Sequence, residues 1–321
     1  MANNHKISTI CFLVNDIDRF ESLNNCFLLS NSAIRLGLKV FLCQVSSISV
    51  SPDGIVGVGV ELHSTLTLGH VFRESDFRSI GLLNMDLIWV MGFGERELFL
   101  DTIEILWLLE SKTQLVNSAS SLMFLSNKYV CSGVVETIES PKSYISADAN
   151  YLIAKVREDN QRSWIMKPPA ESMGRAVFKL SGFETNTCPL IEFASSYRGR
   201  RYLILQEDIG KTKGMERRVL MVDGRIVLSY ERTVATGDHR ANLHVGGTPS
   251  MVKLRQEEID IVERAAKWCS QHGARFIGID LMGELILEIN VVNPGGLATY
   301  FELSGVDLSS SVMKSICILD S

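Results

Sequence analysis

The feature that most constrains the fold is a change in the pattern of strands and helices between the first third of the chain and the rest. In residues 1–120, apolar runs typical of buried strands alternate with segments whose apolar residues have helical spacing. The predicted strands are KISTICFLVN (6–15), KVFLCQV (39–45), MDLIWVMG (85–92) and TQLVNSAS (113–120), and the predicted helices are 20–36 and 95–110. A less regular region lies between the second and third strands. Because strands that alternate with helices pair in parallel, this region is predicted to be a doubly wound parallel sheet.

From about residue 150 the chain reads instead as strand hairpins accompanied by helices. The strand-rich segments are SWIMKPP (163–169), VFKL (177–180), RYLILQEDI (201–209), RRVLMVDGRIVLSYERTV (217–234) and RFIGIDLMGELILEINVV (275–292). VDGRIV and LMGELI each have the Gly-containing turn of a hairpin. The predicted helices are 121–134, YLIAKVRE (151–158) and the amphipathic segment 256–273. The fold class is therefore α/β in the first region and antiparallel α+β in the second.

Length and charge narrow the class of protein. The chain has 321 residues, enough for two or three domains, and a net charge of −5. An acidic balance argues against a nucleic acid or an anionic membrane as the main partner, and no run of 18 apolar residues is present. The seven cysteines are scattered singly, and the N-terminus has no pattern of a signal peptide. We therefore expect a cytoplasmic protein with reduced thiols and no membrane partner.

The stretch LILEIN (285–290) carries an acid and an amide within an aliphatic run. Residues two apart in a strand point the same way, so Glu288 and Asn290 share a face. A three-residue loop at 282–284 would place Asp280 on that face as well, whereas a two-residue loop would place it on the opposite face. Two carboxylates and an amide oxygen on rigid strands would suit Mg²⁺. The alternative is a polar, solvent-facing sheet edge, but the aliphatic neighbours favour burial.

Other polar segments fit a nucleotide site, although each has an ordinary structural alternative. Lys167 ends a predicted strand and precedes a polar loop containing Gly174, where backbone N–H groups could approach phosphate. Alone, Lys167 and Lys128 would more often be surface lysines. The Gly-rich segment 236–247 is either a disordered surface loop or a mobile lid over an active site.

Taken in order, these segments resemble the ATP-grasp superfamily, and within it the bacterial-type glutathione synthetases. The resemblance covers residues 115–315 and rests on SNKY (126–129), WIMKPPAESMGRAVF (164–178), LILQEDIG (203–210), ERRVLMVDGRIV (216–227), RANLHVGG (240–247) and FIGIDLMGELILEINV (276–291). It implies an N-terminal pre-ATP-grasp domain (1–120), a small ATP-grasp lobe (121–205) and a C-terminal lobe with the metal site and lid (206–321).

The resemblance also implies a role for individual residues. Lys128, Lys167 and Gly174 correspond to groups that contact or cover ATP phosphates, Gln206, Glu207, Asp208 and Ile209 to the hinge that holds adenine, and Glu216 to an acid that binds ribose. Asp280, Glu288 and Asn290 correspond to ligands of Mg²⁺ or Mn²⁺. Arg218, Arg240 and Asn242 correspond to catalytic groups, the last two within a lid at 233–247. Arg232, Asn293, Gly295 and Gly296 are expected to bind substrate.

The implied reaction is carboxylate activation by ATP, which gives an acyl phosphate that an amine attacks to form an amide. The partners implied are a small carboxylate and a small amine substrate, and we expect a homo-oligomer. Two departures concern the substrate side. GFGERELFLD (92–101) replaces an Arg-rich, Pro-containing stretch and keeps only Arg96, and VVNPGG (291–296) replaces a Thr/Ser-Ser-Pro sequence.

Glutathione synthetase is the leading hypothesis for the reaction. A peptide or amino-acid ligase with another substrate pair, a silent ATP-binding protein of the synapsin kind and an ATP-grasp kinase are the alternatives.

Overall fold

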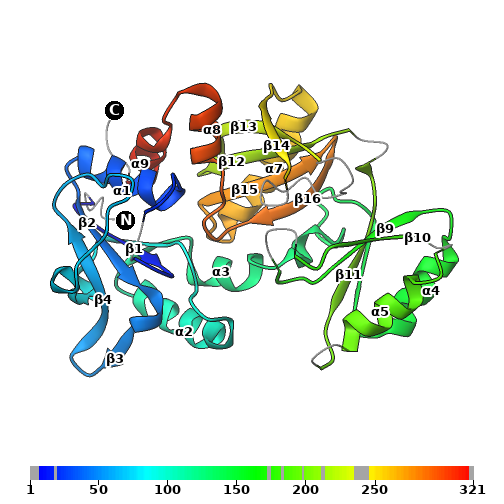
Figure 1. Ribbon diagram of the computed structural model, residues 1–321, viewed down its shortest axis with the longest axis horizontal. Coiled ribbons are helices and arrows are strands. Elements are labelled where there is room, and N and C mark those ends of the chain that lie inside the picture. Colours follow the sequence, from blue (N-terminus) through cyan, green and yellow to red (C-terminus); the bar gives the residue numbers. More distant parts are fainter. Residues whose placement is uncertain are drawn as a thin grey trace.

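The computed structural model describes residues 7–17, 20–171, 175–181, 184–196, 199–210, 214–234 and 246–317. Within these ranges the longer strands are arranged in three sheets, which follow one another along the chain (Figure 1). The predicted combination of an α/β region followed by an α+β region is confirmed. None of the described helices is long and apolar enough to cross a membrane.

The first sheet has a parallel centre, as the sequence predicts. Its strands are β1 (Thr9–Val14), β2 (Lys39–Gln44), β6 (Leu87–Val90) and β7 (Gln114–Val116), in the order β2-β1-β6-β7. Helices α1 (Asn25–Arg35) and α2 (Phe99–Glu110) accompany them. Asn24 begins α1 by accepting a hydrogen bond from the Phe27 backbone N–H. Phe12 and Trp89, on adjacent strands, stack inside the fully buried core.

Three antiparallel strands extend this sheet where the sequence indicated a less regular region. They are β3 (Ser49–Ser51), β4 (Gly54–Leu62) and β5 (Arg78–Gly81), and β4 pairs with β2. Gly59 is required there, because a Cβ at this position would lie 2.0 Å from the Leu42 carbonyl oxygen. The sequence did not predict β4 as a strand, because the segment contains several glycines and glycine is a poor strand former.

The second sheet forms a separate lobe, drawn in green in Figure 1. Its antiparallel strands are β8 (Ser143–Ser146), β9 (Ser163–Lys167), β10 (Phe178–Ser181) and β11 (Leu203–Glu207), in the order β10-β9-β11-β8. Helices α4 (Ala149–Glu158) and α5 (Thr187–Ser196) pack against it around Trp164.

The helix predicted over 121–134 is wrong in extent. Helix α3 (Ala119–Leu125) ends early, and a short 3-10 helix (Lys128–Cys131) follows. Asn127 between them has extended backbone angles, which interrupt the helical path.

The third sheet is antiparallel and holds the predicted hairpins. Its strands are β12 (Glu216–Val222), β13 (Arg225–Thr233), β14 (Thr248–Met251), β15 (Phe276–Met282) and β16 (Leu285–Asn290), in the order β14-β13-β12-β15-β16. The amphipathic helix α7 (Gln256–Gln271) buries Ile261, Ala265 and Cys269 in the core it shares with this sheet. Helices α8 (Leu297–Ser304) and α9 (Ser309–Cys317) follow, and both contact α1 of the N-terminal region.

One asparagine joins the first sheet to the third. Asn117 follows β7, and its amide donates to the carbonyl oxygens of Phe276 (2.8 Å) and Val291 (2.7 Å). Its side-chain oxygen accepts from the backbone N–H groups of Arg275 (2.7 Å) and Phe276 (2.8 Å). The side chain is 2% exposed, so its hydrogen bonds are made away from water.

The division into domains at residues 120 and 205 stays a prediction. Strand β11 crosses residue 205, and α8 and α9 lie against α1 although they belong to the last predicted range.

Candidate active site

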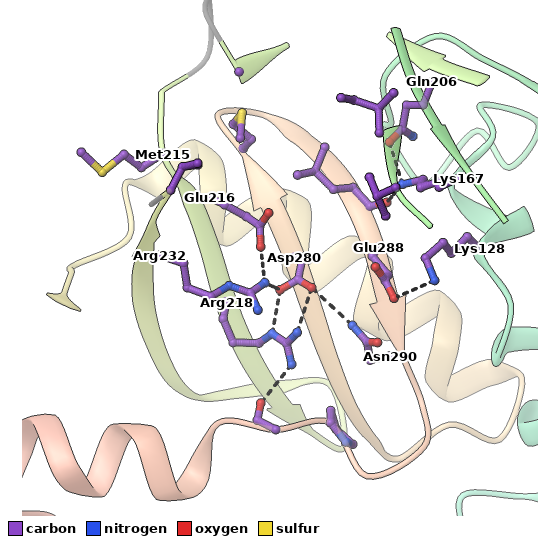
Figure 2. A pocket seen from close by; sticks show the side chains of 18 of the residues that line it. Lys128, Lys167, Gln206, Met215, Glu216, Arg218, Arg232, Asp280, Glu288 and Asn290 are labelled. Carbon is purple, nitrogen blue, oxygen red and sulfur yellow. Dashed lines mark hydrogen bonds and ion pairs between the residues drawn. The ribbon is translucent and has the colours of Figure 1, made fainter. Parts of the chain in front are cut away.

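A cavity of about 980 Å³ is lined by residues of the second and third sheets and of the loops around them (Figure 2). All predicted site residues that the structure describes line this cavity: Lys128, Lys167, Gln206, Glu207, Asp208, Ile209, Glu216, Arg218, Arg232, Asp280, Glu288, Asn290, Asn293, Gly295 and Gly296. The other predicted site residues, Gly174, Arg240 and Asn242, lie outside the described residues, as does most of the predicted lid 233–247.

The three predicted metal ligands lie together because of a β-bulge that the sequence did not indicate. Of the two loops considered, the hairpin has the two-residue one, since Met282 pairs with Leu285. Such a turn alone would put Asp280 on the face opposite Glu288. A register shift between Asp280 and Leu281 leaves Leu287 as an extra residue on β16. This bulge restores the shared face, and Asp280 lies directly opposite Glu288.

Asp280 is the centre of a buried network of charges. Arg218 holds it with two hydrogen bonds, from Nε to Oδ1 (2.6 Å) and from Nη2 to Oδ2 (2.8 Å). Arg232 binds Oδ1 from the next strand but one, and the Asn290 amide lies 3.4 Å from Oδ2 (Figure 2). Burial alone would raise the pKa of Asp280, but the two guanidinium groups outweigh it and lower the pKa. Asp280 is therefore a carboxylate.

Glu216 belongs to the same network. It lies opposite Arg232 on the neighbouring strand and accepts a hydrogen bond from it. Burial raises the pKa of Glu216 to about 7, with a further contribution from Asp280, while Arg232 opposes the shift. In Figure 2 Glu216 points toward Asp280 and lies away from Gln206 of the hinge.

Two lysines converge on the other side of the cavity. Lys167 ends β9 and is 7% exposed, and its Nζ donates to Gln206 Oε1 (2.9 Å). Burial lowers the pKa of Lys167, and repulsion from Lys128 adds to this while Glu288 opposes it. The Lys128 Nζ lies 3.3 Å from Glu288 Oε1 and also donates to the Glu171 carbonyl oxygen. Both ammonium groups thus sit where an anion would be stabilised.

The predicted adenine hinge runs from the end of β11. Gln206 donates to Ser143 Oγ (3.1 Å) as well as accepting from Lys167. The Glu207 and Asp208 side chains form ion pairs with Arg162 and Lys179, and Ile209 contributes a buried apolar surface to the cavity. The backbone of this segment is thereby fixed beside the lysines.

The loop after Asn290 is held from two sides. The Asn25 amide, at the start of α1, donates to Asn293 Oδ1 (3.0 Å) and to the Pro294 carbonyl oxygen (2.7 Å). Arg218 Nη1 donates to the Gly295 carbonyl oxygen (3.0 Å). Asn25 is 4% exposed and was missed by the sequence reasoning. No local pattern signals it, because its partners lie more than 260 residues away.

The donor set fits a hard divalent cation. Two carboxylates and an amide face one another on paired strands, and oxygen ligands are those that Mg²⁺ prefers. Among the described residues no group of three His, Cys, Asp or Glu side chains is placed to hold a metal. The third donor here is an amide, and the carboxylates are held by Arg218, Arg232 and Lys128. A divalent cation bound here would take the place of these side-chain cations as the partner of the two carboxylates.

The fold and this cavity define an ATP-grasp protein. Solved structures include one of similar fold, an ATP-grasp ligase, PsnB, complexed with a minimal precursor. It superposes with a TM-score of 0.64 at 15% identity, over 98% of this chain and 99% of that one.

Residues 131–304 match the model of the family described as prokaryotic glutathione synthetase, ATP-grasp domain, and the chain belongs to this family. The glutathione synthetase of Agrobacterium fabrum (strain C58 / ATCC 33970) is 26% identical over 294 residues, which cover 91% of each protein. A probable α-L-glutamate ligase of Shewanella pealeana (strain ATCC 700345 / ANG-SQ1) is 37% identical over 118 residues, 36% of this chain and 25% of that protein. The chain is therefore an ATP-dependent carbon–nitrogen ligase, and its family implies ATP and a divalent metal ion.

Proposed function

We propose that the protein is a glutathione synthetase, which joins the cysteine carboxylate of γ-glutamylcysteine to the amine of glycine at the expense of ATP. The observation that carries the ligase chemistry is the paired Asp280 and Glu288, which share one cavity with Lys128, Lys167 and Arg218. The choice of substrates is supported by relatives of that name that match over nearly the whole chain.

The binding of ATP follows from the charges on the two sides of the cavity. Lys128 and Lys167 would exchange Glu288 and Gln206 for phosphate oxygens, and Arg218 would face the transferring phosphoryl group. Asp280, Glu288 and Asn290 would hold Mg²⁺, which when bound supplies charge neutralisation to the phosphates. Gln206 to Ile209 would hold adenine beside Lys167.

The chemical step needs alignment more than a covalent nucleophile. A substrate carboxylate oxygen attacks the γ-phosphorus of ATP, the bond to ADP breaks, and an acyl phosphate forms. The amine then attacks the acyl carbon, phosphate leaves and the amine loses a proton. Arg218 would act on both the phosphoryl group and the substrate loop, because its guanidinium group contacts Asp280 and the Gly295 carbonyl oxygen.

Phosphate release tests the proposal. The purified protein with MgATP should release phosphate only when γ-glutamylcysteine and glycine are both present, and the product should have the mass of glutathione. A panel of dipeptide, glutamate and amino-acid pairs includes the substrates of a glutamate ligase. Turnover confined to another pair would overturn the substrate assignment and keep the ligase. ADP without free phosphate would indicate a kinase, and no turnover with any pair would favour a silent ATP-binding protein.

A homo-oligomer and a cytoplasmic location stay predictions of the sequence. Trp107 and Leu100 on α2 are 66% and 53% exposed, an apolar area that supports the first of them. Light scattering on the purified protein measures its mass, and a mass of one chain would contradict the oligomer.

A further inference from the structure

The segment GFGERELFLD (92–101) contains an arginine to which the proposed function gives no role. Arg96 lies in a short 3-10 helix (Arg96–Leu98) that leads into α2, and its side chain is 59% exposed. The structure describes the whole segment, and none of its residues lines the cavity. Any effect of Arg96 on a ligand in the cavity must therefore pass through another residue.

Glu171, in the loop that follows β9, provides that link. Arg96 Nη1 donates to Glu171 Oε1 (2.6 Å), which joins the N-terminal region to the lobe of the second sheet. Glu171 lines the cavity, and its side chain is 25% exposed. An ion pair with this exposure contributes little to the stability of the whole fold. Its local effect is to fix the loop at Glu171.

The backbone of the same loop holds Lys128. The Lys128 Nζ donates to the Glu171 carbonyl oxygen, and the Lys128 backbone N–H donates to the Pro169 carbonyl oxygen (3.3 Å). Lys128 is buried, and its Nζ also lies 3.3 Å from Glu288 Oε1 (Figure 2). An ammonium group has three donors. Lys128 can thus keep the Glu171 carbonyl oxygen while the donor that faces Glu288 turns to a phosphate oxygen.

We propose that Arg96 is a positioning residue for nucleotide binding, which acts through Glu171 to fix the Lys128 ammonium group beside the phosphates. Without Arg96, the Glu171 side chain loses its cation, the loop gains conformational freedom, and the Glu171 carbonyl oxygen holds Lys128 less firmly. An exposed arginine of the N-terminal region thereby sets part of the affinity for a nucleotide bound between the second and third sheets. The inference rests on the proposed role of Lys128 in binding phosphate and is independent of which substrates are joined.

Calorimetric titration of the full-length protein with ADP and Mg²⁺ tests this role without requiring turnover. Arg96→Ala should weaken ADP binding about 3-fold, as expected for the loss of an exposed ion pair, and Arg96→Lys should restore most of the affinity. Lys128→Met should weaken ADP binding about 30-fold, because a charge-assisted hydrogen bond to phosphate is lost. Arg96→Ala added to Lys128→Met should cause no further loss, since the group that Arg96 positions is then absent.

A matched control is Arg35→Ala. Arg35 is also 59% exposed, pairs with Asp307 (3.7 Å) and does not line the cavity, so this variant should bind ADP as the unchanged protein does. An unchanged ADP affinity in Arg96→Ala, or an equal loss with and without Lys128, would overturn the positioning role. A higher KM for the carboxylate substrate at unchanged ADP affinity would also overturn it, because Arg96 would then bind substrate directly.

The same titrations separate this inference from the proposed function. The expected losses in ADP affinity, together with turnover confined to another substrate pair, would support the role of Arg96 and contradict glutathione synthetase. Normal glutathione synthesis by a protein whose ADP affinity does not depend on Arg96 would do the reverse. Failure of ADP to bind the unchanged protein would overturn both.

Discussion

The two ends of the cavity differ in how their polar groups are occupied. At the end proposed to bind phosphate and metal, Asp280 is held by Arg218 and Arg232, and Glu288 is paired with Lys128. At the end proposed to bind substrate, no described group accepts a hydrogen bond from the first N–H groups of α8. Ligands at the first end would replace internal partners, whereas a ligand at the second end would add hydrogen bonds. Substitutions at the first end should therefore lower catalysis, and those that leave a buried carboxylate without its cation should lower stability as well.

The largest effect is expected from Glu288→Ala. This variant lacks a proposed metal ligand. Turnover should fall by about 1,000-fold, because charge neutralisation at the ATP phosphates is lost. The thermal midpoint should change little, since Glu288 is half-buried and its partner Lys128 keeps the Glu171 carbonyl oxygen. Phosphate release and a melting curve are the measurements. Glu284→Ala, in the turn of the same hairpin, is the control, and near-normal turnover by Glu288→Ala with Mg²⁺ would exclude it as a ligand.

Arg218→Ala should be the most destabilising change at this end. It removes two hydrogen bonds from a buried carboxylate, and breaking such a pair costs about 3 kcal/mol of unfolding free energy. Urea unfolding measures the loss. Arg225→Ala, on an exposed residue of β13, should change the unfolding free energy by less than about 0.5 kcal/mol. If the two variants are equally stable, the Asp280 network does not stabilise the fold.

A smaller effect, confined to the substrate end, is expected from Asn25→Ala. The loop at Asn293 and Pro294 loses the donor that fixes it, so KM for the amine substrate should rise by about 5-fold. KM for ATP should stay unchanged, because Asn25 does not line the phosphate end. Steady-state kinetics with each substrate varied in turn separates the two. A parallel rise in both values would mean that Asn25 acts on the whole cavity.

The smallest effect on stability is expected at Asp86, whose carboxylate is stabilised by neutral hydrogen-bond donors and not by cations. Asp86 accepts hydrogen bonds from the backbone and hydroxyl groups of Ser8 and Thr9, at 2.7 to 2.9 Å. Burial raises the pKa of Asp86, but these donors outweigh it and lower the pKa to about 2. Because the folded-state pKa lies below the unfolded one, the stabilisation is present above about pH 4 and is lost as the pH falls toward 2.

Asp86→Asn should accordingly lower the unfolding free energy at pH 6 by about 1 kcal/mol, a value reduced for solvent screening. The difference from the unchanged protein should narrow as the pH falls below 4. Urea titrations at pH 6 and pH 3.5 measure it, and Asp53→Asn, in an exposed turn, is the control. If the difference in unfolding free energy between the two proteins widened at low pH, the lowered pKa of Asp86 would be contradicted.

The parts of the candidate site that depend on local periodicity could be predicted from the sequence. Glu288 and Asn290 share a face because of the two-residue period of a strand, and the hairpin brings Asp280 near them. The bulge at Leu287 could not be predicted, because no residue type marks it, and it decides on which face Asp280 falls. The long strand β4 was missed because its glycines serve close packing against β2.

Residues that act over long sequence separations left no signal at all. Asn25 and Asn117 lie in segments with no recognisable motif, yet each joins the N-terminal region to the third sheet or to the loop that follows it. Their roles follow from packing between distant parts of the chain, which composition and periodicity do not describe.

The contact between α1 and α9 has a consequence for the order in which the molecule folds. Phe27 and Leu29 of α1 share a buried core with Val312 and Ile316 of α9. During synthesis from the N-terminus, the first sheet emerges long before the helix that completes its core. The nascent N-terminal region must therefore keep the apolar face of α1 uncovered until α9 (Ser309–Cys317) is made, and it depends on this late contact for its own cooperativity. This late contact couples α1 to α9, so neither helix is expected to be stable when the other is removed.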